Sequence, residues 1–280
     1  MPVTQATFEL AGRNILSRNN GAFPFEDFRS LFGSSVEVVF EAWCYADLGK
    51  HSPSTYFGLS CLRRRIPRGS PSQAGWCSSK PTFRKWVRYT LTRLTQYFPE
   101  LDLPPDSRWH GLSHSGAWRG WRMGLLWLGW SPIEVQSKVV YEEVQWPGVR
   151  YEIAICIQTG KICWAYGHFP CGKWPDSKIF QHKLQHELGV NEMVEADRGY
   201  TGLPFDVRTP DDYMNEADKI AKSHARARHE IINRRLKQWG CLGQKFRHDL
   251  GFHQTCFRAV VMMTQLAIIH GEPVAFDVEY

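Results

Sequence analysis

Residues 194–200 have the sequence Val194-Glu195-Ala196-Asp197-Arg198-Gly199-Tyr200, in which an acidic residue ends a short apolar run and a glycine follows closely. This pattern predicts a strand that stops at a tight turn, with Asp197 at the strand tip. A second acid, Glu230, lies downstream in a stretch rich in Lys and Arg. If the two carboxylates come together in the fold, they can hold a divalent metal ion against a phosphodiester.

The basic residues around Glu230 favour contact with a polyanion. The chain has 280 residues and a net charge of +6, and its segment 219–247 holds nine Lys or Arg against Glu230 as the one acid. A nucleic-acid surface and an ordinary solvated helix face both fit this pattern, and the candidate metal ligand inside it favours the first. The predicted DNA contacts are Arg226, Arg228, Arg234, Arg235 and Lys237.

The C-terminal part of the chain, 101–280, has the pattern of an α/β domain. Strands are predicted at 151–157 and 162–166, joined by a turn at Thr159-Gly160. A helix that Asp176 can cap comes next, then the strand that ends in Asp197 and the long basic helix. This order of strands and helices is typical of an α/β domain. The first strand of the set would then have to lie inside 109–146.

The N-terminal part, 1–100, is predicted to be mainly helical. Helices are expected over 36–48 and 78–98, and the cations on one face of the second suit either a helix-turn-helix element on DNA or a plain surface helix. Residues 51–76 are dominated by Ser, Pro, Gly and Arg, so we expect a disordered or aberrant segment there.

Composition also bounds the class of protein. The eight cysteines form no Cys-x-x-Cys pair, which favours buried thiols in a reducing, intracellular compartment. Cys163, His168 and Cys171 are close in sequence and leave a structural zinc site as a minor alternative. The polar start and the lack of a long apolar run predict neither a secretory signal nor a membrane span.

Several segments together resemble a known family. They are Tyr151-Glu152-Ile153-Ala154, Thr159-Gly160, Gly167-His168-Phe169-Pro170-Cys171-Gly172, Pro175-Asp176, Ala196-Asp197-Arg198-Gly199-Tyr200, Ala227-Arg228-His229-Glu230 and Phe246-Arg247-His248-Asp249. In these segments the chain resembles the DDE superfamily of transposase endonucleases, and most closely the Harbinger-like group. The resemblance covers about 149–280 and reaches in patches to 28–33 and 82–86.

The resemblance implies an RNase H-like domain, a mixed sheet flanked by helices, that cuts and joins DNA with Mg²⁺ or Mn²⁺. Asp197 matches the second of three metal-binding acids and Glu230 the third. Asp176 matches a further acidic position and is either a metal ligand or the helix cap. The resemblance also implies a nuclear location and a separate DNA-binding partner protein, and it leaves a homo-oligomer open.

The chain departs from the family at the first acid. The family has an Asp-Gly-Thr turn on its first strand, whereas residues 107–175 contain no Asp, and Glu134, Glu142 and Glu143 stand in other contexts. Shifting the reading frame within 51–76 and 109–146 yields family-like residues, so both segments are expected to be aberrant. The hypothesis is a transposase-derived DDE endonuclease domain made inactive by the missing acid. The alternative is a non-catalytic DNA-binding protein of the same origin.

Overall fold

The computed structural model describes residues 4–17, 34–45, 80–96, 125–130, 133–134, 148–156, 160–188, 193–200, 202–203, 207–209, 216–244, 246 and 248–271. The chain forms two compact units. The first is made of Met1–Phe98, Leu236–Gln244 and Gly251–Glu272, and the second of Pro99–Arg235, Lys245–Leu250 and Pro273–Tyr280. The first unit thus includes two C-terminal segments. The expected boundary near residue 100 would assign both of them to the second unit. The segment 51–76 lies outside the described residues, as does 109–146 apart from two strands.

The first unit is helical. Its helices are α1 (Gln5–Ser17), α3 (Val36–Tyr45), α5 (Lys80–Gln96), α10 (Gly240–Gly243) and α11 (Leu250–Ile269). Both helices predicted in 1–100 are present, with C-terminal ends a few residues earlier than expected. Phe8 and Trp43 are buried against each other, with ring centroids 5.6 Å apart. No helix in the described residues is long and apolar enough to cross a membrane.

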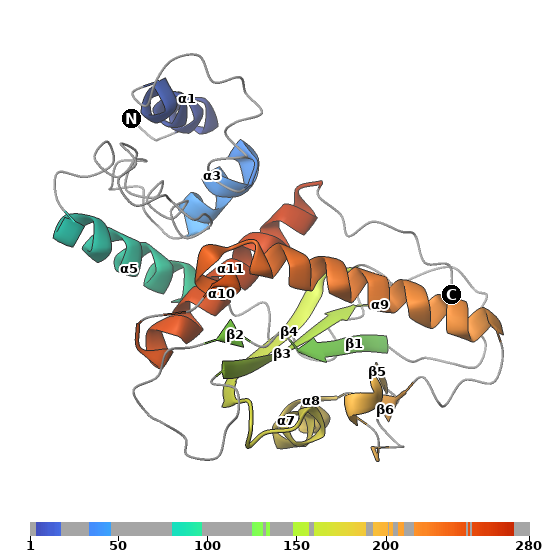
Figure 1. Ribbon diagram of the computed structural model, residues 1–280. Coiled ribbons are helices and arrows are strands. Elements are labelled where there is room, and N and C mark those ends of the chain that lie inside the picture. The colour runs from blue at the N-terminus through green and yellow to red at the C-terminus, as the bar shows by residue number, and fades with distance from the viewer. Residues whose placement is uncertain are drawn as a thin grey trace. The chain divides into compact units, whose positions relative to one another are not determined.

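The second unit is built on a mixed six-stranded sheet (Figure 1). Its strands are β1 (Leu125–Trp130), β2 (Ile133–Glu134), β3 (Gly148–Cys156), β4 (Ile162–Pro170), β5 (Met193–Glu195) and β6 (Val207–Arg208). The spatial order is β4-β3-β1-β5-β6, and β2 pairs with the start of β3. The strands β4, β3 and β1 run antiparallel, and β5 and β6 lie parallel to β1. The first strand of the set, β1, therefore lies inside 109–146 as the layout required.

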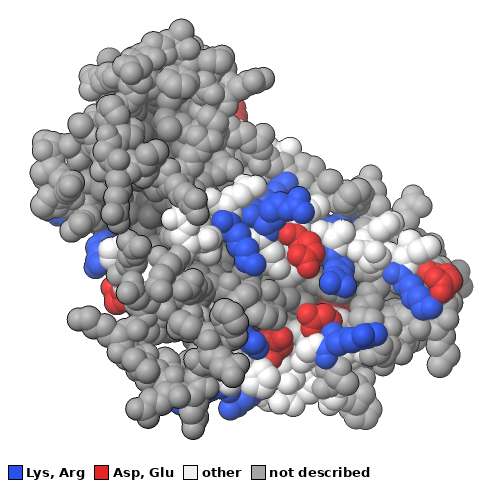
Figure 2. Space-filling view, in the orientation of Figure 1, with Lys and Arg blue, Asp and Glu red and all other residues white. Residues whose placement is uncertain are grey.

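Helices cover both faces of this sheet (Figure 1). Neighbouring residues of a strand point to opposite faces, and β3 shows this at Ile153 and Ala154. The backbone of Ile153 lies against the imidazole of His229 on α9 (Glu216–Lys237). Ala154 packs with residues of α7 (Asp176–His182) and α8 (Leu184–Glu187). The sheet is the middle of three layers, and Figure 2 shows acidic and basic side chains next to each other on the face that α9 crosses.

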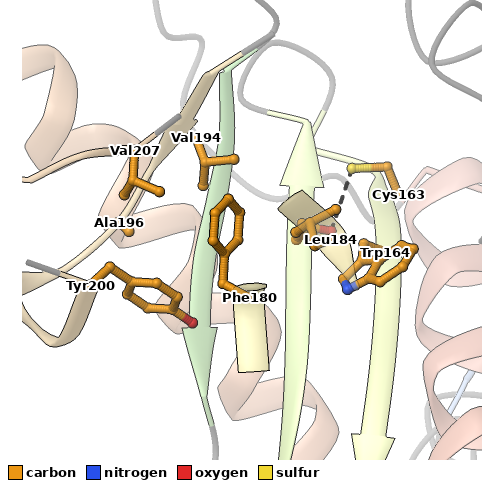
Figure 3. Packing of buried hydrophobic residues seen from close by; sticks show 9 residues of the cluster. Cys163, Trp164, Phe180, Leu184, Val194, Ala196, Tyr200 and Val207 are labelled. Carbon is orange, nitrogen blue, oxygen red and sulfur yellow. Dashed lines mark hydrogen bonds between the residues drawn. The ribbon is translucent and has the colours of Figure 1, made fainter. Parts of the chain in front are cut away.

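The core of the second unit lies between the sheet and the helices α7 and α8 (Figure 3). Its buried members are Ala154, Cys163, Trp164, Phe180, Leu184, Val194, Ala196, Tyr200 and Val207. The ring of Phe180, which is fully buried, meets Tyr200 edge to face at a centroid distance of 6.3 Å. This contact connects α7 to the turn after β5, and so places that turn against the sheet.

A glycine in β4 lets the hairpin of β3 and β4 pair closely. Gly167 has φ +130° at an irregularity in the ladder, where the register shifts between Arg150 and Tyr151. A methyl group on Gly167 would stand 2.7 Å from the carbonyl oxygen of Arg150, closer than atoms tolerate. Bulges of this kind bend a strand and re-aim its side chains, and here the bend precedes the loop that leads to α7.

We predict that Gly167→Ala destabilises the protein by about 2–4 kcal/mol, because the new side chain adds a backbone clash to a strained φ. Gly202→Ala is the matched control, since Gly202 also has positive φ (+98°) but open space around it. The control should cost about 1 kcal/mol from strain alone. Urea unfolding of both variants measures the difference, and equal losses would show that the β3–β4 contact imposes no constraint.

Candidate functional site

Asp197 lies in the tight turn that the sequence predicted. The strand β5 ends at Glu195, and the carboxylate of Asp197 accepts a hydrogen bond from the Gly199 N–H at 2.8 Å. The Tyr200 N–H donates to the Asp197 carbonyl oxygen at 3.2 Å, which closes a single 3₁₀ turn over Arg198–Tyr200. An Asp side chain that bonds the backbone two residues on is typical of such turns. The carboxylate of Asp197 is half-buried.

Asp176 does not cap a helix, and that alternative of the sequence analysis is wrong. The N-cap of α7 is Pro175, in an extended conformation and without a side-chain cap. Asp176 is already the first helical residue, and its Oδ1 pairs with Nη1 of Arg150 at 2.8 Å. The same Nη1 donates to the carbonyl oxygen of Trp174 at 3.1 Å. Asp176 is only 8% exposed and serves as an anchor between α7 and β3.

Asp176 and Asp197 meet at Gly199. A methyl group on Gly199 would lie 2.8 Å from Oδ2 of Asp176 and 2.9 Å from Oδ1 of Asp197. The two oxygens are therefore no farther apart than these distances added together, and only glycine fits between them. Burial raises the pKa of Asp176 and the charge of Asp197 raises it further, while Arg150 opposes both effects. The turn after β5 thus brings two carboxylates to one place.

A third carboxyl group, Glu152, lies close to this pair and was not singled out from the sequence. It is buried in β3, and Nε1 of Trp164 donates to its Oε2 at 2.9 Å. Its Oε1 has no hydrogen-bond partner in the described part of the chain. Burial raises the pKa of Glu152 to about 8, the Trp164 bond lowers it and the charge of Asp176 raises it. Glu152 is therefore mainly protonated at neutral pH, and an acid inside the apolar run 151–157 was the available signal for it.

Glu230 occupies the outward face of α9. It is exposed, as are Arg226 and Arg234, which stand one helical turn before and after it. Residues four apart share one face of a helix, so the three charges form a stripe. No hydrogen bond or ion pair links Glu230 to either arginine within the described residues. The structure provides no contact that joins Glu230 to the Asp176–Asp197 pair, and their convergence stays a prediction.

The other predicted DNA contacts differ in how far their side chains are exposed to solvent. Lys237 is exposed and Arg235 is half-buried. Arg228 is only 4% exposed and has interaction partners inside the chain, so its guanidinium is not available to a DNA backbone. Its prediction as a DNA contact is therefore corrected: position 228 falls on the inward side of α9, two residues from Glu230 and so on a different face.

A buried histidine, His229, precedes Glu230 on α9. The Nδ1 atom of His229 lies 3.1 Å from Nδ2 of Asn233 one turn later, and Ile153 of β3 faces the ring. Burial lowers the pKa of His229 to about 4, and the Ile153 backbone opposes this. The imidazole is therefore neutral and buried, and its Nε2 has no hydrogen-bond partner among the described residues.

The strand β1 carries no acid. Trp127 stands opposite Glu195 in the parallel pair, so Gly129 lies level with Asp197. Gly129 also pairs with Ile153, the residue under His229. The six residues of β1 are Leu, Leu, Trp, Leu, Gly and Trp, none of which binds a metal ion. Glu134, in β2, pairs with Gly148 of β3, and Glu142 and Glu143 lie outside the described residues.

The donor set is thus incomplete for a two-metal centre. Among the described residues no group of three or more His, Cys, Asp or Glu side chains is placed to hold a metal ion. The two cysteines of the zinc alternative have other partners among the described residues. The Cys163 thiol donates to the Ala154 carbonyl oxygen at 3.5 Å, and the Cys171 thiol interacts with Arg150. The pair of Asp176 and Asp197 alone does not fit two bridged divalent ions.

Comparison with known proteins adds no assignment to this geometry. No family model, no curated protein and no solved structure matches the chain.

We predict that Glu152→Gln removes a pH-dependent loss of stability. Because the pKa of Glu152 is raised from 4.5 to about 8, its contribution is full below about pH 4.5 and is lost as the pH rises to about 8. Glutamine keeps the acceptor for Trp164 and does not ionise. The variant should therefore gain on the wild type by up to about 1.4 kcal/mol per pH unit across this window.

Urea unfolding of both proteins at several pH values measures this difference, and the effect of His229 cancels because both proteins contain it. Glu187→Gln, at an exposed position, is the control and should track the wild type. A constant difference between Glu152→Gln and the wild type at all pH values would contradict a protonated Glu152.

Proposed function

We propose that this chain is a transposase-derived DDE endonuclease domain of RNase H-like fold that binds duplex DNA through α9 and does not cleave it. The DNA-binding part of this proposal comes from the exposed stripe on α9. The loss of cleavage comes from β1, which has no acid to complete the set with Asp197 and Glu230. The nuclear location and the separate DNA-binding partner belong to the same proposal and rest on the family resemblance.

The strand order of the second unit supports the proposed fold. Three antiparallel strands, β4, β3 and β1, continue into two parallel strands, β5 and β6, and a long helix follows. The RNase H-like fold of the proposal is likewise a mixed sheet flanked by helices. In this proposal Asp197, which follows β5, is the second metal-binding acid, and Glu230, in α9, is the third.

The observation that carries the DNA-binding proposal is the unneutralised charge on α9. Arg226, Arg234 and Lys237 are exposed on one side of the helix, and within the described residues none of them forms an ion pair. Lys219 is also exposed but is paired with Glu216 at 2.7 Å. With Glu230 among them, these cations leave a net positive charge, and exposed cations exchange bound counterions for DNA phosphates, which favours binding at low salt. A helix face of this kind gives affinity for the backbone without reading sequence.

A metal-dependent endonuclease is the second candidate, and one observation favours it. Asp176 and Asp197 direct one oxygen each toward Gly199, and oxygen ligands of this type suit Mg²⁺ or Mn²⁺. Against it, Arg150 already neutralises Asp176, and β1 supplies no bridging acid. With such a donor set a divalent ion would be bound by few protein oxygens and exchange readily.

We predict that Arg226→Gln/Arg234→Gln weakens binding to duplex DNA and makes it less salt-dependent. Two lost phosphate contacts should reduce the slope of log K against log salt by roughly 2. Fluorescence anisotropy with a labelled duplex at several salt concentrations, in EDTA, measures both quantities. Lys161→Gln/Lys173→Gln removes the same charge from exposed positions outside α9 and should leave the slope close to that of the wild type. An unchanged slope in the arginine variant would identify α9 as a plain solvated face.

We predict that the wild type and Asp197→Asn show the same background level of duplex nicking in Mn²⁺. The reason is that the wild type already lacks the first acid. A supercoiled plasmid assay detects single nicks and therefore tests the endonuclease candidate sensitively. Nicking by the wild type that Asp197→Asn abolishes would reject the non-cleaving proposal, whereas nicking that both proteins share comes from another source.

A further inference from the structure

A cluster of aromatic rings lies at the β4 edge of the sheet, away from α9. Its members are Tyr166, Phe169, Trp174 and His182. The rings of Phe169 and Trp174 have centroids 4.7 Å apart, Trp174 and His182 are 5.1 Å apart, and the rings of Tyr166 and His182 are nearly parallel at 6.0 Å. We call these four residues the aromatic cluster.

The aromatic cluster is open to solvent on one side. Phe169 is buried at its base, but Trp174 and Tyr166 are partly exposed and His182 is exposed. In the described sheet β4 pairs only with β3, so Tyr166 stands on an edge strand. The Tyr166 hydroxyl and the His182 Nδ1 are 3.2 Å apart, which holds these two rings in place. The rings of Tyr166, Trp174 and His182 therefore reach the surface rather than filling a closed core.

Two lysines are held over these rings. The Nζ of Lys178 lies 4.6 Å from the ring centroid of Trp174, and the Nζ of Lys183 lies 5.0 Å from that of Tyr166 and 5.1 Å from that of Trp164. Neither lysine forms an ion pair with another described residue. Ring faces attract a cation without neutralising it, so both positive charges stay available to an anion.

We propose that the aromatic cluster with Lys178 and Lys183 is a binding surface for single-stranded DNA. Exposed bases stack on aromatic side chains, and nearby cations attract the phosphates that join them. A duplex hides its base faces in the helix stack, so the surface distinguishes unpaired from paired strands. It lies apart from the α9 stripe and requires no metal ion. The choice of DNA over RNA rests on the proposed function, whereas the stacking argument does not.

The first test compares ligands for the wild-type protein. Anisotropy in EDTA measures its affinity for labelled oligo-deoxythymidylate, for an abasic oligonucleotide of equal length, for oligo-uridylate and for a duplex competitor. We expect the abasic strand to bind about tenfold more weakly than oligo-deoxythymidylate, because it keeps the phosphates and loses the stacking. Equal affinity for the abasic strand would overturn the stacking surface, and tighter binding of oligo-uridylate would overturn the assignment to DNA.

The second test uses variants of the cluster. Trp174→Leu keeps an apolar side chain against Phe169 and should weaken oligo-deoxythymidylate binding about tenfold. Lys178→Gln and Lys183→Gln should each reduce the salt slope by about 0.7, and Lys161→Gln, an exposed lysine of the β3–β4 turn, should not. His182→Ala, at an exposed position, should also weaken binding and checks the result should Trp174→Leu fail to fold.

The two proposals fail separately. Arg226→Gln/Arg234→Gln should lower duplex affinity and leave oligo-deoxythymidylate affinity within about twofold, and the cluster variants should do the reverse. Folded cluster variants that bind single strands like the wild type would overturn this inference and leave the α9 proposal intact. Thermal unfolding of each variant confirms that a lost affinity does not come from a lost fold.

Discussion

The ion pair between Arg150 and Asp176 connects the parts of the second unit on which the candidate site depends. Arg150 belongs to β3 and Asp176 to the first turn of α7, and the other oxygen of Asp176 reaches the turn at Gly199. The side chains of Arg150 and Asp176 are only 18% and 10% exposed. The loss of either partner therefore leaves a poorly solvated charge and should destabilise the protein by a few kcal/mol. One contact thus sets the distance between a strand, a helix and the turn that holds Asp197.

Two buried titratable groups in the same unit have opposite pH requirements. Glu152 contributes its full stability below about pH 4.5, and this is lost as the pH rises toward 8. His229 contributes its full stability above about pH 6.5, and this is lost as the pH falls toward 4. No pH therefore satisfies both. A fold that buries a carboxyl group under one face of β3 and an imidazole over the other gives up stability throughout the neutral range.

The sequence predicted the local features of the site and missed those made by distant residues. The turn at Asp197 and the hairpin around Gly160 follow from neighbouring residues, as does the presence of a long helix around Glu230. The ion pair of Asp176 could not be predicted from neighbouring residues, because Arg150 lies in β3, far from α7 in sequence. An Asp at the start of a helix is also a common N-cap, which gave a local alternative. The inward position of Arg228 follows from which face of α9 meets β3, and a run of basic residues does not show it. The protonated state of Glu152 depends on the layers that bury it.

The acids of the site differ in what the fold itself requires of them. Asp197 closes its own turn through Gly199 and Asp176 neutralises Arg150, so each has a structural reason for its place. Glu230 has none of comparable size. It is exposed, and its i,i+4 spacing to Arg234 is worth about 0.2–0.5 kcal/mol to a helix. On a helix face that binds phosphates, a carboxylate also weakens the binding. Among these three acids, Glu230 is thus the one that packing explains least, and in the proposed function it is the third metal-binding acid. The proposed transposase origin would account for an acid at that position, whereas a surface that arose only to bind DNA would not.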